Sequence, residues 1–275
     1  MLESMDFRGR SVLVTGASAG LGREIAKLLA IRYGAHVLAV ARRVDRLEQL
    51  RDEVETAGGR MRVLGADLSN AADVERVIVE CSKGDPLYGA VLSAAVTHFG
   101  NYEDLEWSAF ETMLRTNVTS TVRLATELLP RLERSNAGGG LLIVASMAGL
   151  SPVPYQAAYA GTKAFLVNFS ASLWHELRGR NVSITTYAPG GIATEMTAGQ
   201  RFELLRRWLM PADQAALEGI EAFRQRKYIH VPGAMNRIGG VLMKMLPGRL
   251  VGAQLARAYK RSLDAALSAE GATRR

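Results

Sequence analysis

Short apolar runs typical of strands alternate with helical stretches along most of the chain, and this order constrains the fold more than any other feature. Strand and helix follow each other over residues 11–15, 23–33, 35–41, 44–57, 60–65, 71–83, 88–94, 106–134, 140–146, 157–178 and 183–187. Strands and helices of this length form right-handed βαβ crossovers, which produce a parallel sheet covered on both faces. We therefore predict an α/β fold with a doubly wound parallel sheet.

The alternation stops after the last of these strands, and residues 193–275 have the pattern of helices and loops broken by prolines and glycines. A chain of 275 residues with 48% hydrophobic composition fits one domain of this class. We expect residues 8–192 to form the core, 193–250 a lid over the substrate-binding cleft, and 251–275 a C-terminal helix and tail. Such a lid would cover the edge where ligands bind in open α/β folds, at the carboxyl ends of the strands.

The basic excess of the chain is confined to its last quarter. The formal net charge is +7, with 20 basic and 21 acidic side chains in residues 1–200 but 14 and 6 in residues 201–275. These cations could face anionic lipid, nucleic acid, an acidic substrate or only solvent. Zinc-finger spacing, basic heptads and aromatic-rich RNA-binding motifs do not accompany them, so we expect no nucleic-acid partner.

Cysteine usage and the start of the chain favour a cytoplasmic location. Cys81 is the single cysteine and has no partner in the chain for a disulfide, and the first residues lack the long apolar region of a secretory signal. The four histidines are widely separated and show no metal-ligand spacing, so no metal is expected.

A glycine-rich turn closes the first predicted strand and opens the first predicted helix. Its sequence is Thr-Gly-Ala-Ser-Ala-Gly-Leu-Gly over residues 15–22. Glycines permit a tight turn and a close approach of the backbone to a pyrophosphate, which the N–H groups at the helix N-terminus then bind. The turn predicts a dinucleotide site with contacts from Gly16, Ser18, Ala19, Gly20, Leu21 and Gly22, although a tight turn without a ligand has the same pattern.

The end of the second predicted strand favours NADP over NAD. Sites for NAD usually place an acid there to bind the ribose 2′-hydroxyl group. This chain instead has Arg42 and Arg43, and guanidinium groups suit a 2′-phosphate through charge-assisted hydrogen bonds. The alternative is that both arginines belong only to a solvent-exposed turn.

Tyr159 and Lys163 are four residues apart on the predicted helix 157–178, so they project from the same face. A free tyrosine, with a pKa near 10, is a poor acid–base catalyst at neutral pH. A lysine cation beside it, together with a positively charged nicotinamide, would favour the phenolate and lower that pKa. A tyrosine and a lysine at this spacing also occur as ordinary surface packing.

Several further positions occur in the order typical of one family. They are the glycine turn, Asp67 after the third strand, Asn117, Ser146, Tyr159, Lys163, and Pro189-Gly190-Gly191-Ile192-Ala193-Thr194. Over about residues 8–195 the chain resembles the short-chain dehydrogenase/reductase family, which has the Rossmann fold. The resemblance implies an NADP-dependent oxidoreductase acting on CH–OH groups.

The resemblance also implies roles for these residues. Tyr159 would donate a proton to the substrate carbonyl oxygen, while Ser146 would hydrogen-bond that oxygen and stabilise its charge. Lys163 would bind the nicotinamide ribose and lower the pKa of Tyr159, and Asn117 would hold a water that links Lys163 to solvent. The further cofactor contacts that it implies are Asp67, Leu68, Ala94, Ala95, Pro189, Gly190, Ile192 and Thr194, with Tyr159 and Lys163 also touching the cofactor.

One segment departs from the family pattern. After the fourth strand the family usually has Asn-Asn-Ala-Gly, whereas this chain has Ser-Ala-Ala-Val at residues 93–96. We interpret Ala95 as replacing the glycine, which adds a methyl group where backbone runs close to the cofactor. Ala94 and Ala95 are kept as cofactor contacts on this interpretation.

Apolar residues in the C-terminal region predict an apolar substrate. Trp208, Met210, Met235, Met243, Met245 and Leu246 could line a substrate pocket or pack in the core or in an oligomer. Residues 238–253 could alternatively lie on a membrane surface.

The sequence thus predicts an NADPH-dependent ketoreductase or alcohol dehydrogenase that acts on an apolar small molecule. The rival is a cofactor-binding regulator or scaffold protein with little or no turnover on the same fold. Family resemblance implies a homodimer or homotetramer built from the helices at 106–134 and 157–178.

Overall fold

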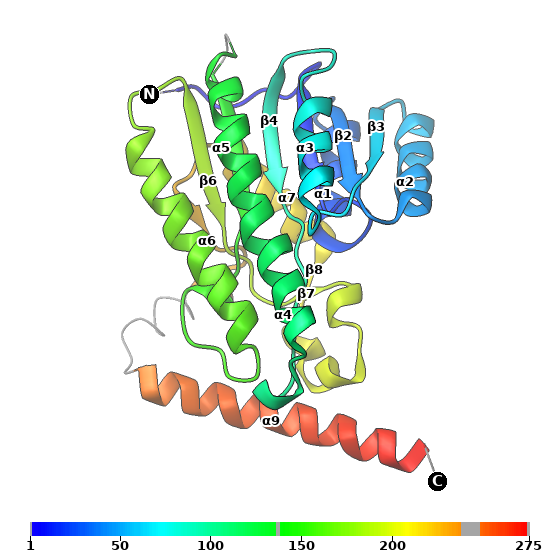
Figure 1. Ribbon diagram of the computed structural model, residues 1–275, viewed down its shortest axis with the longest axis vertical. Coiled ribbons are helices and arrows are strands. Elements are labelled where there is room, and N and C mark those ends of the chain that lie inside the picture. Colours follow the sequence, from blue (N-terminus) through cyan, green and yellow to red (C-terminus); the bar gives the residue numbers. More distant parts are fainter. Residues whose placement is uncertain (1, 136–137, 238–247, 274–275) are drawn as a thin grey trace.

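Seven parallel strands form the central sheet of the computed structural model, which describes residues 2–135, 138–237 and 248–273 (Figure 1). In sheet order the strands are β3 (Arg60–Gly65), β2 (His36–Ala41), β1 (Ser11–Thr15), β4 (Leu87–Leu92), β5 (Gly139–Val144), β6 (Val182–Tyr187) and β9 (Ile229–His230). The chain runs outward from β1 to β3 and then returns to continue from β4 on the other side of β1. This reversal of direction confirms the predicted doubly wound sheet.

Six helices cover the two faces of the sheet (Figure 1). One face packs against α1 (Gly20–Ile31), α2 (Val44–Thr56) and α7 (Ala212–Arg224), and the other against α3 (Ala71–Glu80), α5 (Ser120–Glu133) and α6 (Ala157–Glu176). Along β1, Val12 and Val14 face the first cluster and Leu13 faces the second, as the two-residue period of a strand requires. Because both faces are covered, β4 and β5 are buried along their whole length.

The region after residue 193 contributes more to the core than its sequence predicts. Helix α7 packs on α1 and buries Phe223 completely, and β9 extends the sheet beside β6 through the pairs Thr186–Ile229 and Tyr187–His230. Assigning all of 193–250 to a lid is therefore wrong for 212–230. A strand of two residues is too short to produce a periodic pattern, so its place in the sheet could not be recognised.

A second layer lies beyond the carboxyl ends of the strands. It contains the short pair β7 (Ile192–Ala193) and β8 (Met210–Pro211), the 3-10 helix η5 (Gln200–Trp208) and α9 (Gly248–Thr273), which runs along one end of the molecule (Figure 1). Phe202 of η5 and Tyr259 of α9 pack on Phe99, with ring centroids 4.7 and 5.4 Å from it. This aromatic cluster fixes the layer to the segment that follows β4.

Three of the residues considered for an apolar substrate pocket, Met243, Met245 and Leu246, lie outside the described residues, as do 238–247 of the segment considered for membrane contact. Trp208 and Met235 are 61% and 75% exposed and Met210 packs against the core, so a role of these three in a substrate pocket remains a prediction. None of the helices in the described ranges combines the length and apolar character needed to cross a bilayer.

Candidate active site

The glycine turn between β1 and α1 has a geometry that its three glycines make possible. Gly16 and Gly20 have φ of 72° and 55°, in the left-handed region that glycine adopts without strain. A Cβ on Gly16 would lie 2.9 Å from Cα of Ala94, and one on Gly22 would lie 2.5 Å from the carbonyl oxygen of Gly16. A Cβ at Gly16 or Gly22 would therefore meet backbone, so neither position has room for a side chain.

Helix α1 begins at Gly20 without a side-chain cap. The residue before it, Ala19, has no side chain that could cap the helix, and the first turn contains no acidic residue. The first N–H groups of a helix have no partner within it, and the helix dipole makes this end positive. Thr194, from the segment after β6, borders the turn, because a Cβ on Gly20 would lie 3.0 Å from its methyl carbon.

Replacing Gly22 by alanine should destabilise the protein by about 1–3 kcal/mol, the usual cost of overpacking a tight site. The matched control is Gly161→Ala, also within a helix, where an added Cβ meets no atom within 4 Å. That variant should gain about 0.5–1 kcal/mol, because alanine is the better helix former. Urea unfolding of both variants checks the pair, and equal stabilities would contradict the close packing of the turn.

The end of β4 is tied to its neighbours by two polar side chains. The Thr15 hydroxyl accepts hydrogen bonds from the backbone N–H groups of Ser93 and Ala94, at 3.0 and 3.2 Å. Asn117 accepts from the N–H of Val96 and donates to its carbonyl oxygen, both at 2.9 Å. The Ser-Ala-Ala-Val segment is thus held at the sheet edge without the family's asparagines. Counted residue by residue, the family's glycine corresponds to Val96, so placing it at Ala95 was wrong.

Asn117 lies in a π-helical turn, Arg115–Thr119, which interrupts the predicted helix 106–134 between α4 (Trp107–Leu114) and α5. Turns of this kind are frequent at functional sites. Its side chain is fully buried and donates a further hydrogen bond to the Thr162 hydroxyl, at 3.1 Å. Asn117 therefore connects the β4 segment with α6. Both amide hydrogens of Asn117 already have acceptors. A water could therefore bind Asn117 only by donating a hydrogen bond to Oδ1.

The carboxyl end of β3 carries Asp67 and Leu68. One carboxylate oxygen of Asp67 accepts hydrogen bonds from the N–H and the hydroxyl of Ser69, at 2.9 and 2.8 Å, and Leu68 is buried in the core. Asp67 is thus engaged in its own turn. The adenine contact that the resemblance implies for these two residues remains a prediction.

The arginines after β2 differ in their surroundings. Arg42 is exposed, whereas Arg43 donates from Nε and Nη2 to the Ser18 hydroxyl of the glycine turn, both at 3.3 Å. The remaining nitrogen, Nη1, lies 2.9 Å from a carboxylate oxygen of Glu195, whose other oxygen pairs with Arg46. Arg46 and Glu195 were missed from the sequence. Arg46 could have been found, because it lies three residues after Arg43 on the first turn of α2.

Ser146 follows β5 and is held by backbone groups. Its hydroxyl accepts from the N–H of Ala148 at 3.1 Å and lies 3.4 Å from the carbonyl oxygen of Pro189. The N–H of Met147 donates to the same oxygen at 2.8 Å. The segments after β5 and β6 are therefore joined at this point, and Ser146 and the 189–194 segment lie at one edge of the sheet.

Tyr159 and Lys163 project from the first turns of α6 beside Ser146. Lys163 is 2% exposed, and its Nζ donates to the carbonyl oxygen of Val144 at 2.9 Å. The same nitrogen lies 5.7 Å from the centroid of the Tyr159 ring, and Ser146 is near enough to the phenol to influence its pKa. The structure thus brings Ser146, Tyr159 and Lys163 together, and Asn117 reaches them through Thr162.

Burial controls the protonation of this group. Burial raises the pKa of Tyr159, and the nearby Ser146 acts in the opposite direction but has the smaller effect. Burial also lowers the pKa of Lys163, to about 8. Burial therefore acts against the lowering of the Tyr159 pKa that is expected from Lys163 and a bound nicotinamide. A raised pKa keeps the phenol protonated at neutral pH, the form that can donate a proton.

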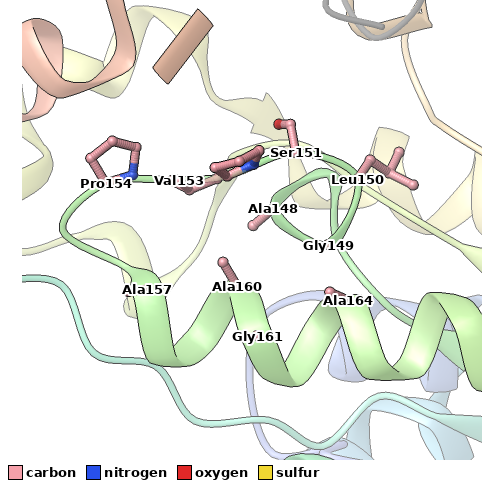
Figure 2. A pocket seen from close by; sticks show the side chains of 11 residues that line it. Ala148, Gly149, Leu150, Ser151, Val153, Pro154, Ala157, Ala160, Gly161 and Ala164 are labelled. Carbon is pink, nitrogen blue, oxygen red and sulfur yellow. The ribbon is translucent and has the colours of Figure 1, made fainter. Parts of the chain in front are cut away.

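A shallow groove of about 570 Å³ adjoins this wall of the site, between the loop after Ser146 and α6 (Figure 2). Its lining is apolar and small, and the methyl groups of Ala148 and Ala160 point into it (Figure 2). Ala160 comes directly after Tyr159, and Ala164 directly after Lys163. One residue corresponds to a rotation of about 100° around a helix. The groove therefore flanks the reacting groups on a different face of α6.

Comparisons with known proteins identify the family of this chain. The model of the short chain dehydrogenase family matches residues 10–204. An uncharacterized oxidoreductase of Myxococcus xanthus (strain DK1622) is 38% identical over 197 residues, covering 71% of this chain and 77% of its own. The chain belongs to the short-chain dehydrogenase/reductase family and is an oxidoreductase of that family.

Two other comparisons carry more specific names. A hydroxysteroid 11-beta-dehydrogenase 1-like protein of Gallus gallus is 34% identical over 222 residues, covering 76% of this chain and 73% of its own. The solved short-chain dehydrogenase from Sphingobium yanoikuyae, in complex with NADPH, is 25% identical with a TM-score of 0.76, covering 86% of this chain and 94% of its own.

Among the described residues, no group of three or more His, Cys, Asp or Glu side chains could hold a metal ion.

Proposed function

We propose that the protein is an NADP-dependent ketoreductase or alcohol dehydrogenase, which transfers a hydride between the nicotinamide and a carbonyl or hydroxyl carbon of an apolar small molecule. The observation that carries the proposal is the placement of Tyr159 beside Ser146, with the buried Lys163 5.7 Å from the Tyr159 ring. These groups lie at the same sheet edge as a glycine turn built for a pyrophosphate.

The residues present fit a dinucleotide. Gly16 and Gly22 have no room for a side chain, the N-terminus of α1 has no side-chain cap, and Thr194 borders the turn. Backbone N–H groups there would hold the pyrophosphate, and Thr194, Lys163 and the 189–192 segment would hold the nicotinamide end. Arg43 beside Ser18, with Arg46 next to it, supports a 2′-phosphate and hence NADP.

In the reductive direction the bound cofactor supplies the hydride that the carbonyl carbon receives. Ser146 donates a hydrogen bond to the carbonyl oxygen and stabilises the charge that develops on it. Tyr159 transfers the proton of its hydroxyl group to that oxygen, which completes the alcohol and leaves a phenolate. The ammonium group of Lys163 stabilises this phenolate, and Asn117 positions the turn of α6 that carries both residues.

An apolar substrate is supported by apolar side chains in the layer beyond the strand ends and on the neighbouring face of α6. Phe99, Phe202 and Tyr259 form a cluster in the layer beyond the strand ends, and the groove beside α6 is lined by small apolar residues. The hydroxysteroid name of the relative from Gallus gallus agrees with this class.

We include a homodimer or homotetramer in the proposal, because α6 exposes 46% of Phe165 next to Phe169. A cytoplasmic location agrees with Cys81, a buried free cysteine.

Oxidation of NADPH and of NADH by a panel of apolar ketones tests the proposal. We expect turnover with NADPH to exceed turnover with NADH, and Arg43→Ala to lower kcat/KM for NADPH by about 3–10-fold, the worth of an exposed charge pair. Arg51→Ala, which removes another partly exposed arginine of α2, is the matched control and should change neither value. A wild-type preference for NADH, or equal effects of both variants, would contradict the NADP assignment.

A further inference from the structure

The Glu195 carboxylate forms ion pairs with the guanidinium groups of Arg43 and Arg46, which would bind the 2′-phosphate of the cofactor. One of its carboxylate oxygens lies 2.9 Å from Nη1 of Arg43, and the other pairs with Nη1 of Arg46. A guanidinium group recognises carboxylate and phosphate with the same donors. The carboxylate therefore holds the position of an anion bound between the first turn of α2 and the glycine turn.

The chain context of Glu195 places it at the cofactor cleft. It begins the 3-10 helix η4 (Glu195–Thr197) directly after Thr194, whose methyl carbon borders Gly20 of the turn. Arg43 reaches the same turn from the other side through the Ser18 hydroxyl. The ion pair thus links the segment after β6 with the start of α2, and Ser18 of the turn contacts the same guanidinium.

Resting on the proposed NADP dependence, we propose that Glu195 is a specificity-determining residue that competes with the 2′-phosphate of the cofactor for Arg43 and Arg46. All three nitrogens of Arg43 have partners in the structure, two on Ser18 and one on Glu195. A phosphate brought to Nη1 meets the Glu195 carboxylate, and like charges in contact oppose binding. The carboxylate therefore has to move before the phosphate binds.

The expected change in phosphate affinity is limited by the solvent exposure of the three side chains. The side chains of Arg43, Arg46 and Glu195 are 43%, 38% and 55% exposed, so water and salt screen the pairs. Exposed ion pairs contribute at most about 1 kcal/mol each, so releasing them should change phosphate affinity by about three- to ten-fold. Glu195 thus reduces the preference for a phosphorylated cofactor without abolishing it. A cofactor without the 2′-phosphate leaves the ion pairs intact.

The experiment compares 2′,5′-ADP with 5′-AMP, which differ only by the 2′-phosphate, by calorimetric titration of the full-length protein. Glu195→Gln keeps the shape of the side chain and removes its charge. We expect this variant to bind 2′,5′-ADP about three- to ten-fold more tightly than wild type, with 5′-AMP unchanged and the difference shrinking in high salt. The matched control is Glu203→Gln, which removes an equally exposed partner of an arginine, Arg206, in η5.

The possible results distinguish failure of the Glu195 proposal from failure of the NADP assignment. Unchanged or weaker binding of 2′,5′-ADP by Glu195→Gln, with wild type still preferring it over 5′-AMP, would overturn the competition and leave the NADP assignment standing. If neither wild type nor Glu195→Gln distinguishes the two nucleotides, and Arg43→Ala changes nothing, the NADP assignment itself fails and the role of Glu195 fails with it. An equal gain in Glu203→Gln would show a general charge effect and would also overturn the proposal.

Discussion

Tyr159→Phe should lower kcat by about 10²–10⁴-fold, the contribution of a positioned general acid. The substitution removes only the hydroxyl group, so the ring of Tyr159 stays near Lys163 and the cofactor site is unchanged. We therefore expect the dissociation constant of NADPH to stay within about two-fold of wild type, well below a 1.4 kcal/mol change. Steady-state kinetics and a fluorescence titration of NADPH measure the two quantities.

The matched control for this substitution is Tyr102→Phe, because the Tyr102 side chain is 81% exposed and the change is chemically identical. Its turnover should equal that of wild type. Full activity in Tyr159→Phe would remove the phenol from the mechanism. A protein that binds NADPH but turns over no substrate even as wild type would instead support a cofactor-binding regulator or scaffold.

Lys163→Met should abolish most turnover and at the same time raise the free energy of unfolding at neutral pH. Burial lowers the pKa of Lys163 from 10.5 to about 8. At 1.36 kcal/mol per pKa unit, holding this lysine protonated in the folded state costs about 3 kcal/mol at neutral pH. The methionine side chain removes that cost but also loses the hydrogen bond to Val144, worth about 1 kcal/mol.

The pH dependence of stability isolates the Lys163 charge. Between the folded and unfolded pKa values the unfolded chain binds more protons, so stability rises with pH. The unfolding free energy of wild type should therefore rise relative to that of Lys163→Met by about 2 kcal/mol between about pH 7 and about pH 10. Urea unfolding at several pH values measures this difference. A difference that does not change with pH would mean that Lys163 has an ordinary pKa.

The fold was largely predictable because its central strands are buried on both faces and alternate with helices of typical length. The first strand was predicted over 11–15, as observed, and the helix that carries Tyr159 was predicted over 157–178 against 157–176. Strand β9 could not be predicted, because its two residues have no periodicity and its place depends on pairing with β6. The same is true of the π-helical turn at Asn117, which continues a helical pattern without a break.

The site was predictable where chemistry requires a particular residue type at a particular element end. The glycine turn, Ser146 and the Tyr159–Lys163 pair follow this rule, because each lies at the end of a strand or at the start of a helix. Glu195 could not be predicted, because its partners lie about 150 positions earlier in the chain. The direction of the Tyr159 pKa shift was also inaccessible, since it depends on burial that only the packed structure provides.

Hydride transfer itself can be followed with NADPH that carries deuterium at the transferable position of the nicotinamide. Incubated with this cofactor and an apolar ketone, the protein should form an alcohol with one deuterium on the carbinol carbon, as mass spectrometry of the product would record. Tyr159→Phe should form far less of the same labelled alcohol. A wild-type protein that binds NADPH yet leaves every ketone unlabelled and unreduced would contradict the account.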